Sequence, residues 1–132
     1  MVVLADDLMW STRIAESIRR AGGRAVPLSG EAELTIALEA QQVGDEPSLS
    51  GAVVDMGARR VDAVAAIARI SAARLPVIAV AQHDDQLIRR RALQAGASRV
   101  FSYQKYFVDG TRLVERWLAA GAAGAAGTSE AS

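Results

Sequence analysis

Short runs of apolar residues alternate along the chain with longer stretches in which apolar residues recur every three or four positions. The short runs are rich in β-branched residues, which is typical of strands buried on both faces of a parallel sheet. The longer stretches have the spacing of amphipathic helices. Strands are predicted over 2–5, 25–28, 51–55, 76–81 and 99–102. Helices are predicted over 11–21, after Ser29 through Leu38, after Gly57 through Ile70, from Asp84 or Asp85 to Gly96, and from about 107 or 111 to 119.

The regular alternation of strands and helices predicts a parallel sheet with helices on both faces, because crossovers between parallel strands are right-handed. Pro27 cannot donate a backbone hydrogen bond, so its strand is predicted at a sheet edge. We expect a flavodoxin-like, doubly wound α/β fold with five parallel strands in the order 2-1-3-4-5 and five helices. Residues 1–119 form one predicted domain. Residues 120–132 are rich in Ala, Gly and Ser, and we predict a disordered tail or linker stub there.

Composition narrows the class of protein. The chain has 132 residues, 15 basic and 15 acidic side chains and no cysteine. The length fits one domain, and the lack of cysteine excludes disulfides and thiolate metal sites and agrees with a reducing, cytoplasmic setting. No apolar run approaches the roughly 20 residues of a membrane-spanning helix, so we expect no membrane contact. Zero net charge and the absence of a recognition motif disfavour direct binding to nucleic acid.

Carboxylates follow two of the predicted strands. Asp6 and Asp7 come directly after the first strand, and Asp55 ends the third. In the order 2-1-3-4-5 these strands are neighbours, and a crevice opens between their carboxyl ends. Crowded carboxylates recruit a hard cation, so Asp6, Asp7 and Asp55, with a backbone carbonyl such as that of Gly57, form a candidate Mg²⁺ site. Each aspartate taken alone could equally be a helix cap or a loop residue.

Four segments together resemble the receiver domain of two-component response regulators, and the resemblance extends to about Leu118. They are Val2-Val3-Leu4-Ala5-Asp6-Asp7, Val53-Val54-Asp55, Pro76-Val77-Ile78-Ala79-Val80-Ala81 followed by Asp84-Asp85, and Ala92-Leu93-Gln94-Ala95-Gly96-Ala97. The resemblance implies that Asp6 and Asp7 are the metal-binding acidic pair. It implies that Asp55 is the nucleophile that accepts a phosphoryl group from a histidine kinase, with Mg²⁺ offsetting the charge on the phosphoryl oxygens.

The chain departs from the receiver pattern at the residues that hold the phosphoryl group. Receivers place Thr or Ser at the end of strand four, where this chain has Ala81. They place a lysine at the end of strand five, where this chain has Tyr103, and Lys105 comes two residues later. The aromatic switch position falls on Val100. Without the lysine the phosphoryl group loses its main protein cation, and hydrogen bonds to charged groups contribute about 1.5–3 kcal/mol each.

The expected function is therefore that of an atypical receiver, or pseudo-receiver, in two-component signal transduction. Such a domain acts by contact with a histidine kinase or another signalling protein, and it is no enzyme beyond self-phosphorylation and autodephosphorylation. Phosphoryl acceptance at Asp55 is expected to be weak or lost. A homodimer through the fourth helix, fifth strand and fifth helix fits the same family. Two alternatives stay open, a fully phosphorylatable single-domain response regulator and a small Mg-dependent phosphohydrolase.

Other side chains lie near the expected crevice. Arg59 or Arg60 could fold back and place a guanidinium on Asp55. Trp10, in the segment after the first strand, could shield the crevice, offer a docking surface or pack as an ordinary core residue. Trp117 has helical spacing from its apolar neighbours and is predicted in the core.

Overall fold

A computed structural model describes residues 1–43 and 49–127 of the chain. Its five strands form one parallel sheet in the order β2-β1-β3-β4-β5, which confirms the predicted flavodoxin-like fold. The strands are β1 (Val2–Leu4), β2 (Val26–Leu28), β3 (Ala52–Asp55), β4 (Val77–Ala81) and β5 (Arg99–Ser102). The helices are α1 (Leu8–Arg20), α2 (Glu31–Val43), α3 (Ala63–Ala72), α4 (Gln86–Ala95) and α5 (Tyr103–Gly127).

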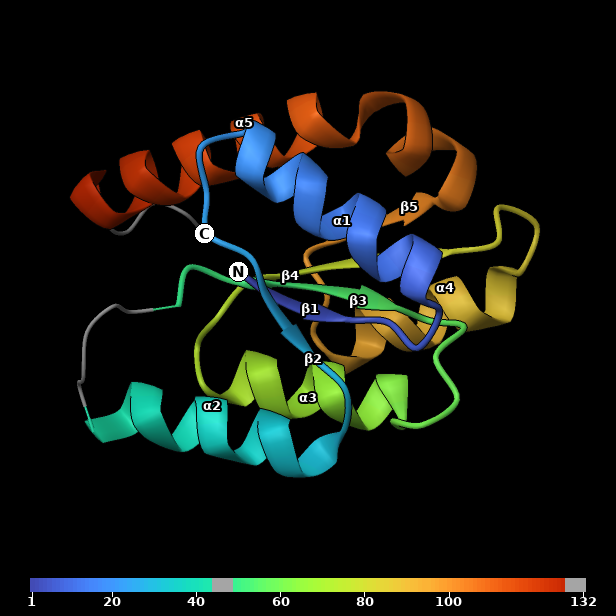
Figure 1. The fold of residues 1–132 in the computed structure, drawn as a ribbon, viewed down its shortest axis with the longest axis horizontal. Coiled ribbons are helices and arrows are strands. Elements are labelled where there is room, and N and C mark those ends of the chain that lie inside the picture. Colours follow the sequence, from blue (N-terminus) through green and yellow to red (C-terminus); the bar gives the residue numbers. More distant parts are fainter. Residues whose placement is uncertain (44–48, 128–132) are drawn as a thin grey trace.

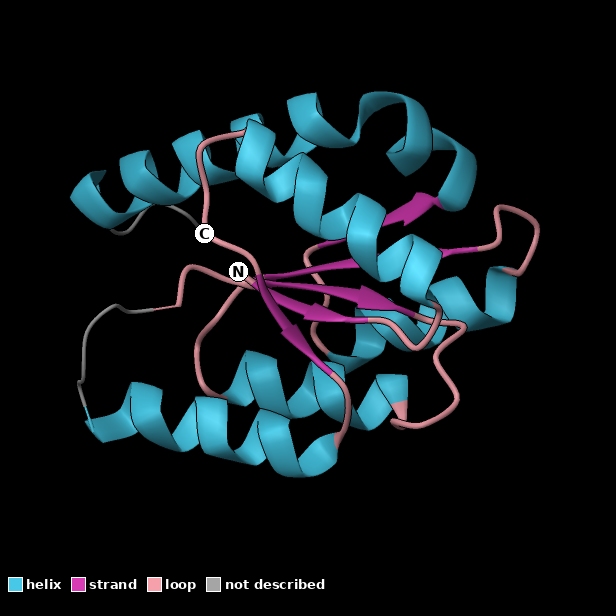
Figure 2. Ribbon diagram, viewed as in Figure 1, coloured by secondary structure: helices cyan, strands magenta, loops and turns pink. Residues whose placement is uncertain are grey.

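The molecule has three layers, with the sheet between two layers of helices. Helices α1 and α5 cover one face, and α2, α3 and α4 cover the other (Figures 1 and 2). Successive side chains of a strand point to opposite faces. In β1, Val2 and Leu4 pack into the core under α2, α3 and α4, whereas Val3 packs into the core under α1 and α5. The predicted core residue Trp117 packs against this second cluster.

The strand order decides which segments meet at the carboxyl edge of the sheet. Strand β2, which contains Pro27, lies at one edge as predicted. Strand β1 lies beside β3, with Leu4 paired to Val54. Because these strands are parallel, the residues that follow β1 emerge next to Asp55, the last residue of β3.

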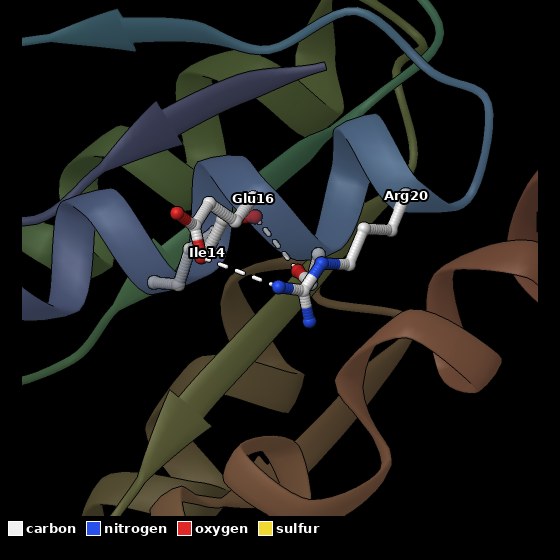
Figure 3. Close-up of polar contacts among 4 residues, drawn as sticks. Ile14, Glu16 and Arg20 are labelled. Atoms are coloured by element: carbon white, nitrogen blue, oxygen red, sulfur yellow. Dashed lines mark hydrogen bonds and ion pairs between the residues drawn. The ribbon is translucent and has the colours of Figure 1, made fainter.

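Helix α1 separates a buried face from an exposed one. Ile14 and Ile18 are fully buried, whereas Glu16 and Arg20 form an exposed ion pair with 4.0 Å between their charged atoms (Figure 3). Such a pair contributes little to stability in water. On the buried side, the Ser17 hydroxyl donates to the carbonyl oxygen of Ile14 at 2.7 Å.

Several predicted helix limits differ from the structure, including those of α3, which spans Ala63–Ala72. Helix α1 begins at Leu8 and not at Ser11, because the side chain of Asp7 caps it. Helix α2 begins at Glu31, and Ser29 contributes its backbone N–H, which donates to Glu33, rather than its side chain. The end of α2 includes 41–43, the start of the predicted loop 41–50, and 44–48 lie outside the described residues. Helix α4 begins after Asp85 and ends at Gly96 as predicted.

Helix α5 differs most from its prediction, because it begins at Tyr103 and not at 107 or 111. The Ser102 hydroxyl accepts a hydrogen bond from the backbone N–H of Lys105 at 3.0 Å, so the last residue of β5 acts as the helix cap and no loop intervenes. The helix continues through 120–127, where a disordered tail was predicted. Local propensity does not account for this extension, because its alanines favour a helix whereas Gly121, Gly124 and Gly127 disfavour one. Residues 128–132 of the predicted tail lie outside the described part.

In the described part of the chain, no helix has both the length and the apolar character needed to cross a membrane.

Candidate functional site

Asp55 is the most enclosed carboxylate at the carboxyl edge of the sheet. Only 4% of its surface is exposed. Its Oδ1 atom accepts a hydrogen bond from the backbone N–H of Gly57 at 2.8 Å, and a second one from the hydroxyl of Tyr103. A buried carboxylate is stable only with such donors, so this pair of bonds is part of what holds Asp55 in place.

Asp6 links the end of β1 to the loop after β3. Its Oδ2 atom accepts hydrogen bonds from the backbone N–H groups of Arg59 and Arg60, the second at 2.7 Å. The two arginines therefore meet the acidic cluster through their backbone and at Asp6, and their side chains are exposed. The hypothesis of a guanidinium folded onto Asp55 is not met in this arrangement.

Asp7 has the role of a helix cap. Its Oδ1 atom accepts from the backbone N–H of Met9 at 2.8 Å and of Trp10 at 3.3 Å. These bonds satisfy N–H groups that have no partner inside the first turn of α1. This is the ordinary alternative to a metal-binding role for an aspartate at a strand end.

The acidic side chains reach the same edge but do not form a metal-binding group. Among the described residues, no three His, Cys, Asp or Glu side chains are placed to hold one ion. Asp6 and Asp7 each direct a carboxylate oxygen to backbone N–H groups. The Mg²⁺ site expected at Asp6, Asp7, Asp55 and Gly57 therefore stays a prediction.

Tyr103 is the residue that the resemblance to receivers puts at the position of their lysine. As the first residue of α5 it points back over the sheet edge and donates its hydroxyl hydrogen to Asp55. Burial raises the pKa of Tyr103 above its usual value, and the hydrogen bond to Asp55 raises it further. The phenol therefore stays protonated near neutral pH and acts as an uncharged donor.

Lys105 turns away from this group. Its Nζ atom lies 2.9 Å from Oδ2 of Asp109, one turn further along α5. The hydrogen bond from Lys105 holds the pKa of Asp109 below its usual value. Lys105 is thus engaged on its own helix and does not replace the lysine that the receiver pattern expects.

The two other departures from the receiver pattern lie on the neighbouring strands β4 and β5, of which only β5 is at an edge of the sheet. Ala81 is buried at the end of β4 and pairs with Ser102 of β5. Val100 packs toward α2, α3 and α4, whereas Phe101 packs toward α1 and α5, as the alternation of a strand predicts. Neither Ala81 nor Val100 has a side chain that can donate a hydrogen bond to a phosphoryl group.

Trp10 covers the Tyr103 ring. The two ring centroids lie 4.8 Å apart at an angle of 41°. On its other side Trp10 meets Phe107 of α5 edge-on, at 6.4 Å and 81°. The guanidinium carbon of Arg13 lies 4.0 Å from the centre of the Phe107 ring. Of the roles considered for Trp10, shielding of the crevice is the one that this geometry supports.

Sequence reasoning placed Tyr103 at the edge but did not find its bond to Asp55. The helix was predicted to begin several residues later, which would have left Tyr103 in a loop. The available signal was Ser102, a residue type that often caps helices, directly at the end of an apolar run.

No family model matches the chain, and no curated protein matches its sequence. Solved structures do match. A receiver domain from Rhodospirillum rubrum is 19% identical with a TM-score of 0.68, over 89% of this chain and 92% of that one. The receiver domain of a sensor histidine kinase from Pseudomonas aeruginosa PAO1, solved with a magnesium ion in its active site cleft, is 20% identical with a TM-score of 0.68, over 89% and 95%.

A response regulator protein from Burkholderia pseudomallei, solved with a phosphorylated aspartic acid, calcium and citrate, is 13% identical with a TM-score of 0.68, over 96% of this chain and 73% of that one. At such identities a structural match establishes the fold and leaves the function to the residues of the site. The five-stranded sheet of this chain has the fold of response-regulator receiver domains.

Proposed function

We propose that this chain is an atypical receiver domain in two-component-type signalling, and that it acts through protein contact. In this proposal Asp55 accepts a phosphoryl group weakly or not at all. The observation that carries it is the hydrogen bond from the Tyr103 hydroxyl to Oδ1 of Asp55, at the position of the receiver lysine. An uncharged donor holds the carboxylate where the family pattern has a cation.

Physical chemistry supports a weak acyl phosphate at this site. A phosphoryl group on Asp55 would carry close to two negative charges, which need cationic or polar partners. Tyr103 offers one neutral donor, Ala81 offers none, and Lys105 pairs with Asp109. Each lost charge-assisted bond amounts to about 1.5–3 kcal/mol, which is a factor of about ten or more in stability of the phosphorylated state.

The proposed mode of action is contact with a histidine kinase, another signalling protein or a second copy of the chain. For a second copy we propose the surface of α4, β5 and α5. Leu87 and Leu93 of α4 are about half exposed, at 53% and 52%. Arg90, Arg91 and Arg99 are exposed around them. Balanced charge and the absence of cysteine support a cytoplasmic location without nucleic acid or membrane as partner.

Incubation with acetyl phosphate, with and without Mg²⁺, tests the proposal. Intact-mass spectrometry measures the phosphoryl group gained, and amide NMR spectra measure the conformational response. We expect a small fraction of phosphorylated protein, absent in Asp55→Asn, and unchanged amide resonances away from the site. Stoichiometric phosphorylation with a change across the whole domain would show a fully phosphorylatable response regulator instead. Steady hydrolysis of a phosphate ester, lost in Asp55→Asn, would show a phosphohydrolase.

Restoring the cation is the complementary test. Tyr103→Lys places an ammonium group beside Asp55, where it can bind the phosphoryl oxygens. We expect the phosphorylated fraction at steady state to rise by roughly tenfold, the effect of about 1.4 kcal/mol. Gln104→Lys is the matched control, because it adds the same charge at the next, exposed position. An equal rise in both variants would mean that net charge, and not the position of the cation, controls phosphorylation.

A further inference from the structure

The Tyr103 hydroxyl reaches Asp55 through a gap that exists only because residue 57 has no side chain. A Cβ atom on Gly57 would lie 2.8 Å from the hydroxyl oxygen of Tyr103 and 3.3 Å from Oδ1 of Asp55. Real Cβ atoms do not approach other atoms as closely as the first distance. Gly57 also lacks the left-handed backbone conformation that would by itself favour glycine. Its lack of a side chain thus matches the space that the hydroxyl occupies.

The ring of Tyr103 is also held by an aromatic wall, which consists of Trp10 and Phe107. Trp10 of α1 packs against it, and Trp10 in turn meets Phe107 of α5. The contact of Trp10 with Phe107 is edge-on, a favoured geometry of aromatic pairs, and the rings of Trp10 and Tyr103 are tilted with their centroids 4.8 Å apart. The wall joins two helices that pack together on one face of the sheet (Figure 1). Tyr103 is therefore fixed by its ring as well as by its hydroxyl.

We propose that Tyr103 is a latch that closes over the Asp55 carboxylate, and that Trp10 is the positioning residue that keeps the latch shut. The proposal rests on the receiver-type function proposed above and names how its acceptor is controlled. The latch differs from the usual receiver switch, which couples the phosphoryl group to the end of β4 and to the position of Val100. Here Asp55 is coupled to Trp10 of α1 through Tyr103, the first residue of α5. Displacement of Trp10 releases Tyr103 and exposes Oδ1 of Asp55.

Once exposed, the carboxylate can act as a nucleophile toward an acyl phosphate. An oxygen of Asp55 forms a bond to phosphorus, and the bond from phosphorus to the acyl oxygen of the donor breaks. The donor leaves as a carboxylate with the electron pair of that bond, and no proton needs to move. With the latch closed, the hydroxyl of Tyr103 and the backbone N–H of Gly57 both engage Oδ1 of Asp55, and the ring of Tyr103 lies over the carboxylate.

Carboxyl labelling tests the latch without any phosphoryl transfer. The full chain is treated with a water-soluble carbodiimide and an amine, and peptide mass spectrometry measures the rate at Asp55 against exposed Asp84 in the same sample. We expect Tyr103→Phe and Gly57→Ala each to raise the relative rate at Asp55 by roughly tenfold, the factor for one lost hydrogen bond to a charged group.

Two matched controls accompany these variants. Tyr106→Phe removes a hydroxyl from the same helix, but that hydroxyl pairs with Ser17 and not with Asp55. Gly30→Ala adds a methyl group where no atom lies within 4 Å. Both controls should leave the labelling rate at Asp55 unchanged. A rise in the controls equal to that in Tyr103→Phe would overturn the latch, since general loosening would then explain it.

A double-mutant cycle tests the role of Trp10. Trp10→Leu should raise the labelling rate, whereas Trp10→Phe, which keeps an aromatic ring, should restore most of the protection. In the Tyr103→Phe background, Trp10→Leu should add nothing further, because the bond it controls is already lost. Additive effects of the two changes would overturn the positioning role.

The labelling experiment tests the latch, and the acetyl phosphate experiment tests the proposed function, so either proposal can be overturned without the other. Rapid, stoichiometric phosphorylation of the unaltered chain would overturn the proposed function. Equal labelling of Asp55 in the unaltered chain and in Tyr103→Phe would overturn the latch and leave the weak-acceptor function standing. Tyr103→Phe keeps the packed ring, so it should fold, and its thermal unfolding checks this.

Discussion

At the scale of single residues, three carboxylates at one sheet edge have three different surroundings. Asp55 binds a backbone N–H and a phenol, Asp6 binds two successive backbone N–H groups, and Asp7 caps α1. The difference follows from chain direction. Asp7 immediately precedes the first turn of a helix, whereas Asp6 faces the loop after the neighbouring strand. Identical side chains one position apart therefore do different work.

The capping role of Asp7 predicts how substitutions there affect stability. Asp7→Ala should lower the free energy of unfolding by about 1 kcal/mol, because two N–H groups at the start of α1 lose their acceptor. Asp7→Asn should cost much less, since an amide oxygen caps about as well. Urea denaturation measures both. An asparagine variant as unstable as the alanine variant would contradict capping as the reason for this aspartate.

The sequence predicted which residues lie at the carboxyl edge of the sheet. It did not predict which of these residues contact one another. Strand ends and chain order were enough to place the end of β1 beside the end of β3, because parallel strands share one carboxyl edge. The bond between Tyr103 and Asp55 depends on a helix that starts without a loop and on the missing side chain of Gly57. Neither condition is a periodic pattern, so neither could be predicted from hydrophobic spacing.

At the scale of elements, α1 and α5 act as a pair joined by a buried polar contact. The hydroxyls of Tyr106 and Ser17 lie 2.7 Å apart, and Tyr106 is 2% exposed. A buried hydroxyl needs such a partner. The same two helices also carry the edge-on contact between Trp10 and Phe107.

From the burial of Tyr106 we expect a lower free energy of unfolding at high pH. Burial raises the pKa of Tyr106 from 10.0 to about 12, with the hydrogen bond to Ser17 acting in the opposite direction. Below pH 10.0 the tyrosine is protonated in both folded and unfolded chains, and its contribution is complete. Between pH 10.0 and about 12 the unfolded chain ionises first, so the free energy of unfolding falls as pH rises through this window.

Urea denaturation at several pH values checks the expected loss, with Tyr106→Phe as the comparison. The variant should be less stable near neutral pH by about 1 kcal/mol, because one hydrogen bond is lost. Its stability should fall less steeply above pH 10.0, because the titrating group is gone. Parallel pH profiles for the two proteins would contradict the assignment of this titration to Tyr106.

At the scale of the whole molecule, the order of strands was predictable and the ends of the helices were not. Apolar runs separated by amphipathic stretches leave few ways to bury both faces of a parallel sheet. The starts of α1 and α5 depend on single capping residues, Asp7 and Ser102. Local polar contacts decide such limits, and the hydrophobic pattern does not record them.

At the same scale, the exposed apolar side chains of the described residues include two pairs that could meet partners. One is on α4, where Leu87 and Leu93 are half exposed. The other is at the start of α1, where Leu8 and Met9 are 80% and 62% exposed. For a second copy of the chain we propose the α4 surface, because an interface with twofold symmetry must be complementary to itself.

Sedimentation over a range of concentrations measures the proposed association. We expect a dimer that dissociates on dilution, and we expect the double variant Leu87→Glu with Leu93→Glu to stay monomeric because it buries like charges at the twofold contact. The matched control, Leu8→Glu with Met9→Glu, adds the same charge to the other surface and should still dimerise. If only the control variant dissociated, the dimer contact would lie at the start of α1 and not on α4. A monomer at every concentration would leave contact with a different protein as the only mode of action in the proposal.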